Sequence, residues 1–254
     1  MRRVSLILSI FFMVVACQTV PYTHRKALML IPPSIELQLG LNAYQEILHK
    51  SRLSHNPRYV SMVRRVGRRI ARAAHRPDYK WEFNVIKNDK VINAFCLPGG
   101  KIAVYTGLMK LVSSDAELAT VIGHEVGHAI ARHGAERMSQ LLLVELGGIA
   151  IQEALKKKPR KTLQLAMIAY GVGTTLGILL PYSRLQEYEA DRIGLILMAK
   201  AGYDPHAALS FWNKMYKKFK GKEPPEFLST HPLTKHRIAR IKKLIPEAMR
   251  YYRH

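Results

Sequence analysis

The segment His124-Glu125-Val126-Gly127-His128 combines two imidazoles and one carboxylate at a spacing that suits metal chemistry. Residues four apart in an α-helix lie on the same face, one turn from each other. His124 and His128 can therefore bind one metal ion, and Glu125 can act as a general base on a metal-bound water. The alternative interpretation is a surface helix that carries two solvated histidines.

The surrounding residues indicate that this helix is largely apolar. Ser114 and Glu117 form a capping box, which predicts a helix start, and Gly134 predicts its end. Apolar residues recur between them at helical spacing, namely Leu118, Val121, Ile122, Val126 and Ala129. Because an unpaired imidazole is costly in apolar surroundings, a shared metal ion is a favourable partner for both rings.

A catalytic zinc ion needs a third protein ligand in addition to a water molecule. Ser183 and Gln186 form a second capping box, which predicts a helix that runs from there to Gly202. Glu187 and Asp191 are four residues apart on one face of this helix. Glu187 can bind the metal, while Asp191 holds a ligating histidine through its other ring nitrogen. An ordinary acidic helix face is the alternative.

These two helices together resemble those of gluzincin metallopeptidases. The pattern Ser183-Arg184-x-x-Glu187-x-x-Ala190-Asp191-x-x-Gly194 is similar to that of the family of the type I CAAX prenyl protease, the heat-shock protease HtpX and the mitochondrial Oma protease. The resemblance extends over roughly residues 35 to 245. The other stretches that carry it are Asn93-Ala94-Phe95, Leu97-Pro98-Gly99-Gly100, Tyr105-Thr106-Gly107 and Ser229-Thr230-His231-Pro232 with Arg237.

The resemblance implies an α+β fold that is mainly α-helical. We expect one gluzincin metallopeptidase domain over residues 34–254, with a small three-stranded sheet packed on the H-E-x-x-H helix. It also implies one zinc ion per chain and hydrolysis of peptide bonds, with Glu125 as the catalytic base.

Further roles follow only from the resemblance. His231 is expected either to stabilise the oxyanion or to occupy the open zinc position as a latch, and Arg237 is a weaker candidate for the same roles. The strand that contains Asn93, Ala94 and Phe95 is expected to bind an extended substrate by strand addition.

The amino terminus has the pattern of a secretory signal. Arg2 and Arg3 precede an apolar stretch from Val4 to Val15, and Val14-Val15-Ala16-Cys17 is similar to a bacterial lipobox. We therefore expect a signal peptide over residues 1–16, lipidation of Cys17 and a linker over residues 17–33. A plain signal peptide with an incidental cysteine is the alternative.

Gln18 follows the proposed lipidation site, as in lipoproteins that are sent to the outer membrane. The expected location is thus the bacterial cell envelope, with a lipid anchor in the outer membrane and the domain facing the periplasm. Unfolded or misassembled envelope proteins are the expected substrates, in a quality-control role. The rival function is that of a non-proteolytic periplasmic holdase or outer-membrane assembly chaperone with the same groove.

The chain is strongly basic, with a formal net charge of +22. Such a charge is typical of proteins that bind nucleic acid or an anionic membrane surface. Because an exported chain meets no nucleic acid, we expect anionic lipid headgroups or lipopolysaccharide as partners, and a merely soluble basic surface is the alternative.

Periodicity predicts the remaining elements. Residues 162–181 are uncharged and mostly apolar, long enough to cross a membrane, yet we expect them to form a buried helix. Residues 139–155 and 164–180 are expected to form a helical hairpin that covers the active site. Further helices are expected at about 35–50, 57–74, 205–219 and 234–244, and strands at about 81–85, 91–95 and 101–105.

Overall fold

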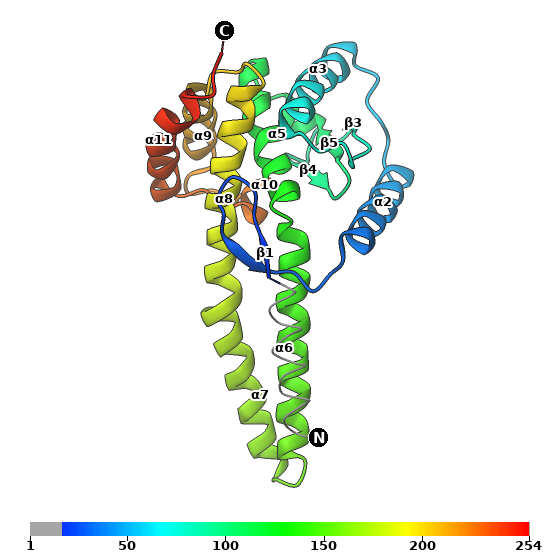
Figure 1. Ribbon diagram of the computed structural model, residues 1–254, viewed down its shortest axis with the longest axis vertical. Coiled ribbons are helices and arrows are strands. Elements are labelled where there is room, and N and C mark those ends of the chain that lie inside the picture. Colours follow the sequence, from blue (N-terminus) through cyan, green and yellow to red (C-terminus); the bar gives the residue numbers. More distant parts are fainter. Residues whose placement is uncertain (1–16, 254) are drawn as a thin grey trace. The chain divides into compact units, whose positions relative to one another are not determined.

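The computed structural model of the chain describes residues 17–253, so the predicted signal peptide over residues 1–16 lies outside the described residues. The chain divides into two compact units. We call residues 33–131 and 187–253 the sheet unit, and residues 17–32 and 132–186 the hairpin unit. The fold is mainly helical with one small three-stranded sheet, which confirms the predicted fold class (Figure 1).

The sheet unit contains the three-stranded sheet and most of the helices. Its elements are α2 (Pro33–His49), α3 (Pro57–Ala74), β3 (Glu82–Ile86), β4 (Ala94–Leu97), β5 (Lys101–Tyr105), α4 (Thr106–Met109), α5 (Asp115–Ile130), α9 (His206–Phe219), α10 (Glu226–Thr230) and α11 (Lys235–Met249). The helix α8 (Leu180–Lys200) enters this unit at Glu187.

The strand order is β3-β5-β4, with β3 parallel and β4 antiparallel to the central strand β5. Phe95 pairs with Ala103 in this sheet. The helix α5 packs against β4 and against α3, as expected for a sheet that lies on the H-E-x-x-H helix. Because β4 has only one partner strand among residues 17–253, one of its edges is available for strand addition.

The helix α5 begins after the N-cap Ser114 as predicted, but the second hydrogen bond of the predicted capping box comes from the Ser113 amide rather than from the Ser114 amide. The Ser114 hydroxyl accepts a hydrogen bond from the Glu117 amide, and the Glu117 carboxylate accepts one from the Ser113 amide at 2.7 Å. The predicted end at Gly134 is wrong. The helix ends at Ile130, since Arg132 adopts the left-handed conformation with φ of 58° and Gly134 lies inside the next helix.

Two glycines bring α5 and α8 into close contact. A Cβ atom on Gly127 would lie 2.8 Å from the Ala190 carbonyl oxygen, and one on Gly123 would lie 2.9 Å from the Gly194 carbonyl oxygen. Side chains at these positions would force the two backbones apart. The close crossing therefore sets the distance between the His124 helix face and the Glu187 helix face.

The hairpin unit consists of two short strands and a long helical pair. The strands β1 (Cys17–Thr19) and β2 (Lys26–Leu28) form an antiparallel pair within the residues that the sequence assigns to a linker, and Cys17 is exposed. The pair is formed by α6 (His133–Leu155) and α7 (Arg160–Thr174), which continues through the π-helical turn η1 (Thr175–Leu179) into α8 (Figure 1).

Two expectations about this hairpin are wrong. Ser183 does not cap a helix, because the chain is helical without a break from Arg160 to Lys200 and Gln186 instead bonds to Glu136 at 2.9 Å. A π-helical turn next to Pro181 lets the helix continue past a residue that lacks an amide hydrogen. Residues 162–181 are also not buried, as most of their side chains are exposed or half-buried.

The carboxy-terminal helices largely agree with the sequence. The helix α8 ends at Lys200 before Gly202, which has a φ of 74°, and α9 ends at Phe219 as predicted. The last helix α11 begins after the N-cap Thr234 but runs past the predicted end to Met249, with Pro246 inside it.

Candidate metal centre

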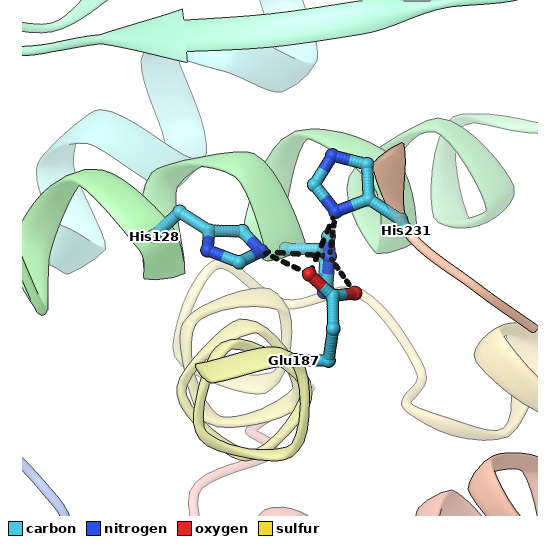
Figure 2. Close-up of side chains that lie close together, drawn as sticks. His128, Glu187 and His231 are labelled. Carbon is cyan, nitrogen blue, oxygen red and sulfur yellow. Dashed lines mark hydrogen bonds and ion pairs between the residues drawn. The ribbon is translucent and has the colours of Figure 1, made fainter. Parts of the chain in front are cut away.

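Four side chains from three segments of the sheet unit converge on one point (Figure 2). His124 and His128 come from α5, and His231 follows α10. Glu187 comes from α8, at the residue where this helix enters the sheet unit. One ligand atom from each of them lies within 4.8 Å of the others. The structure thus brings together the two histidines and the glutamate that the sequence proposes as ligands, with His231 as a fourth member.

The donor set fits a zinc ion. A tetrahedral zinc ion with ligand distances of about 2.0–2.1 Å has about 3.3 Å between its ligand atoms. His128 Nε2 lies 3.1 Å from His124 Nε2 and 3.2 Å from Glu187 Oε1. His124 Nε2 lies 3.4 Å from Glu187 Oε2. These three distances are close to the spacing of ligand atoms in a tetrahedral site.

His231 occupies the fourth corner of this arrangement. Its Nδ1 atom lies 3.0 Å from Glu187 Oε1 and 3.3 Å from His124 Nε2. Both distances match the spacing of the other ligand atoms, so His231 can bind the same ion in this conformation. The position it takes is the one that a catalytic site leaves open for water or substrate.

The carboxylate of Glu187 is ionised by its surroundings. Burial alone would raise the pKa of Glu187, but hydrogen bonds from the three histidines of the cluster outweigh burial and hold the pKa well below its usual range. An ionised carboxylate is a suitable ligand for a divalent cation, and the imidazole nitrogens that face it become ligands as metal binding displaces their protons.

Asp191 lies where the sequence predicts. Its Oδ1 atom is 3.0 Å from His124 Nδ1, so it fixes the ring and leaves Nε2 free to face the cluster. Burial would lower the pKa of His124, whereas the hydrogen bonds to Asp191 and Glu187 raise it to about 9. Burial raises the pKa of Asp191 itself, but the Arg237 guanidinium lowers it to about 2.

Arg237 holds two carboxylates of the centre. It is 1% exposed, and its Nε and Nη2 atoms donate to the two oxygens of Asp191 at 2.7 and 2.8 Å. Its Nη1 atom lies 2.8 Å from Glu187 Oε2. The guanidinium is therefore engaged with these carboxylates, which favours a positioning role over contact with substrate.

Two aromatic residues that pack against the histidines of this cluster, Trp212 and Phe227, belong to no motif found in the sequence. The Trp212 ring lies 4.9 Å from the Arg237 guanidinium and stacks on Phe227 with a centroid distance of 5.8 Å. Both aromatic residues are fully buried. Their helical spacing indicates only core packing, and nothing in the sequence links them to the centre.

Glu125 lies beside the cluster but points to a different position from the ligands. It is 5% exposed, and its Oε1 atom makes no hydrogen bond within the described chain. His231 Nε2 lies 3.4 Å from this oxygen. Burial raises the pKa of Glu125. A carboxylate with a raised pKa is a better proton acceptor, as a general base requires.

The predicted substrate strand is shorter than expected, since β4 begins at Ala94 rather than Val91. Asn93 still accepts a hydrogen bond from the Tyr105 amide at 3.0 Å, and Phe95 is part of the strand. Just before them, the Ile92 carbonyl accepts a hydrogen bond from the Phe227 amide at 3.2 Å. The helix α10, which precedes His231, therefore also contacts the residues just before β4.

We predict that Asp191→Ala weakens metal binding about 10- to 100-fold, as the loss of a residue that hydrogen-bonds to a metal ligand typically does. The reason is that the His124 ring loses its 3.0 Å contact and Arg237 loses its principal partner. Competition with a chelator of known affinity measures the change. Asp89→Ala, at an exposed carboxylate paired with Lys110, is the matched control. Equal affinity in the two variants would remove Asp191 from the support of the site.

Comparison with known proteins identifies metallopeptidases as relatives of this chain. The model of Peptidase family M48 matches residues 57–245. The chain is 40% identical over 185 residues to the mitochondrial metalloendopeptidase OMA1 of Arabidopsis thaliana, a match that covers 72% of this chain and 36% of the relative. The protein of the same name from Schizosaccharomyces pombe is 35% identical over 234 residues, covering 90% of this chain and 66% of the relative.

A bacterial relative is also similar. The beta-barrel assembly-enhancing protease of Escherichia coli is 29% identical over 212 residues, covering 80% of this chain and 42% of the relative. The chain thus spans about one third to two thirds of the length of these curated relatives. The cluster of two histidines and one glutamate is a metal site typical of the matched family.

Proposed function

The chain belongs to peptidase family M48, and we propose that it is a zinc-dependent endopeptidase that cleaves unfolded or misassembled proteins. The observation that carries this proposal is the convergence of His124, His128 and Glu187 at tetrahedral spacing beside the buried base Glu125. A protein that only binds polypeptides has no need of a buried carboxylate at that place. This disfavours the holdase alternative.

The proposed chemistry divides between the metal and the chain. One zinc ion per chain, held by the three ligands, would polarise the attacking water and the peptide carbonyl when bound. Glu125 accepts the proton of the water as the carbonyl is attacked, and it returns the proton to the leaving amine. Asp191 and Arg237 keep His124 and Glu187 in place during both steps.

The substrate class follows from the edge strand. An extended peptide that pairs with β4 is held by backbone hydrogen bonds, which require an unfolded segment but no particular sequence. The bacterial relative is named a beta-barrel assembly-enhancing protease, which supports a quality-control role on envelope proteins.

We also propose that the chain is exported and anchored to an envelope membrane, with its sheet unit in the periplasm. The lipobox pattern and the exposed position of Cys17 support lipidation of this residue. Incorporation of radiolabelled palmitate that is lost in Cys17→Ser tests this part of the proposal. Palmitate uptake by Cys17→Ser would refute it. The excess of positive charge supports contact with anionic headgroups rather than with nucleic acid.

Digestion of casein by the purified protein tests the activity, with the products identified by mass spectrometry. Internal cleavage that stops on chelation of the metal and returns with zinc supports an endopeptidase. Suppression of aggregation without any cleavage would instead support the holdase.

We predict that His231→Ala raises the turnover of casein without loss of zinc. In the present conformation His231 occupies the fourth ligand position, so its removal opens that position to water and substrate. If the open state is populated about 10% of the time, turnover rises up to about tenfold. His236→Ala, at an exposed histidine on α11, is the control.

The opposite sign would assign the other role to His231. An oxyanion donor is worth about 10²- to 10³-fold in turnover, so a loss of that size in His231→Ala would contradict the latch. Unchanged turnover and zinc affinity would remove His231 from the site.

A further inference from the structure

The α6–α7 pair exposes far more apolar side chain than a surface hairpin of a soluble protein normally does. In α6, only 17% of the most apolar stretch of 18 residues is buried. In the helix from Arg160 to Lys200, the corresponding share is 6%. The large exposed apolar side chains are Leu141, Leu142, Leu143, Leu146, Ile149, Leu165, Ile168, Val172, Leu176, Ile178 and Leu180. A core helix would be mostly buried, and a surface of this kind marks an interaction site.

The lengths of the two helices match the thickness of a bilayer. The helix α6 has 23 residues, and α7 with η1 extends from Arg160 to Leu179. At about 1.5 Å per residue, each is about 30 Å long or more, the thickness of a hydrocarbon core.

Two polar side chains of α7, Tyr170 and Thr174, find hydrogen-bond partners within the pair. The Tyr170 hydroxyl donates to the Val144 carbonyl at 2.8 Å, and the Thr174 hydroxyl donates to the Tyr170 carbonyl at 2.9 Å. Gly147 lies against the Tyr170 ring so closely that a Cβ atom would be 2.2 Å from its hydroxyl. Internal hydrogen bonds and small residues at the contact are features of helix pairs in membranes.

Charges lie almost entirely at the two ends of the pair. The helix that starts at Arg160 has no charged residue between Lys161 and Arg184. In α6, Glu145 is the only ionisable side chain well inside the apolar stretch, because Glu153 lies near the tip and pairs with Lys156. The tip itself carries five cations, namely Lys156, Lys157, Lys158, Arg160 and Lys161.

We propose that the α6–α7 pair crosses a lipid bilayer as a helical hairpin. The chain enters and leaves the pair at the same end, so residues before His133 and after Gln186 lie on one side and the basic tip lies on the other. Short loops rich in Lys and Arg remain on the cytoplasmic side. The tip is therefore cytoplasmic, and the ligands His124, His128 and Glu187 are on the outer side.

This orientation places the hairpin in the cytoplasmic membrane. Helical spans are inserted there, whereas proteins of the outer membrane cross it as closed barrels. The proposed membrane is accordingly the inner membrane rather than the outer membrane that Gln18 suggests. The sheet unit is still proposed to lie in the periplasm.

Accessibility of single cysteines tests the proposal without any use of peptidase activity. In a Cys96→Ser chain, where Cys17 is the remaining native cysteine, Lys158→Cys places a thiol at the tip and Ser61→Cys places one on the exposed face of α3. A membrane-impermeant maleimide is applied to intact spheroplasts and to lysed ones, and the Cys96→Ser chain alone gives the background. We expect Ser61→Cys to be labelled in both samples and Lys158→Cys only after lysis.

Two charges in the second helix provide the matched control. Adding Ile168→Lys and Val172→Lys should prevent insertion and make the tip thiol react in intact spheroplasts, while Ser61→Cys still reports export. Equal labelling of Lys158→Cys and Ser61→Cys in the unaltered hairpin would overturn the span, and it is the result expected if a second copy of the chain covers the apolar surface. Labelling of the tip alone in intact spheroplasts would overturn the orientation.

Discussion

Glu125→Gln is expected to keep its zinc and its fold and to lose about 10²- to 10⁴-fold in peptide hydrolysis, the range that general acid–base catalysis contributes. Gln has nearly the shape of Glu but cannot accept the proton of the attacking water. Glu125 is not one of the convergent ligand atoms, so its replacement leaves His124, His128 and Glu187 in place. Hydrolysis of casein and zinc per chain, measured on one preparation, give both quantities.

Glu46→Gln is the matched control, because Glu46 is an exposed carboxylate on α2 that pairs with Lys50. Its activity should equal that of the unaltered chain. Comparable turnover in Glu125→Gln would dismiss Glu125 as the base. Loss of zinc together with activity would show instead that Glu125 supports the metal site.

Glu187→Ala is expected to lose nearly all bound zinc and, with it, the activity. Without Glu187, only His124 and His128 remain as lasting ligands, because His231 has to leave its position before water or substrate can bind, and two ligands are too few for a catalytic zinc site. The substitution also leaves the Arg237 cation next to the cluster without the carboxylate that now lies 2.8 Å away. A positive charge there repels a divalent ion, so the loss should exceed that of Asp191→Ala.

Glu189→Ala tests whether the effect is specific to position 187. Glu189 is buried on the same helix but does not belong to the convergent cluster. Its variant should bind one zinc ion if its circular dichroism matches that of the unaltered chain. Full zinc occupancy in Glu187→Ala would contradict the ligand assignment.

Local signals were sufficient to predict the elements that carry the ligands. The capping box at Ser114 and the spacing of His124 and His128 fixed the α5 face, and helical spacing placed Glu187 and Asp191 together on α8. These predictions succeed because they depend on the geometry of single helices. The three-stranded sheet was predicted from alternation and from the family resemblance, with errors only at strand ends.

Features that depend on tertiary contacts could not be predicted in the same way. Ser183 has the residue type of an N-cap, but it lies inside α8, which continues the helix of α7 and η1 without a break. The close approach of Gly123 and Gly127 to α8, and the contact of Arg237 with Trp212, join segments far apart in the chain. The apolar residues 162–181 look alike whether they face a protein core or lipid, and the structure shows them exposed.

Stepwise return of zinc to the metal-free protein tests the central claim most directly. Casein hydrolysis is measured after each addition, together with the amount of zinc bound per chain. The proposed site predicts that activity rises in proportion to bound zinc and reaches its maximum at one ion per chain. Hydrolysis at full rate without zinc, or no hydrolysis with one ion bound at this site, would contradict a zinc-dependent endopeptidase.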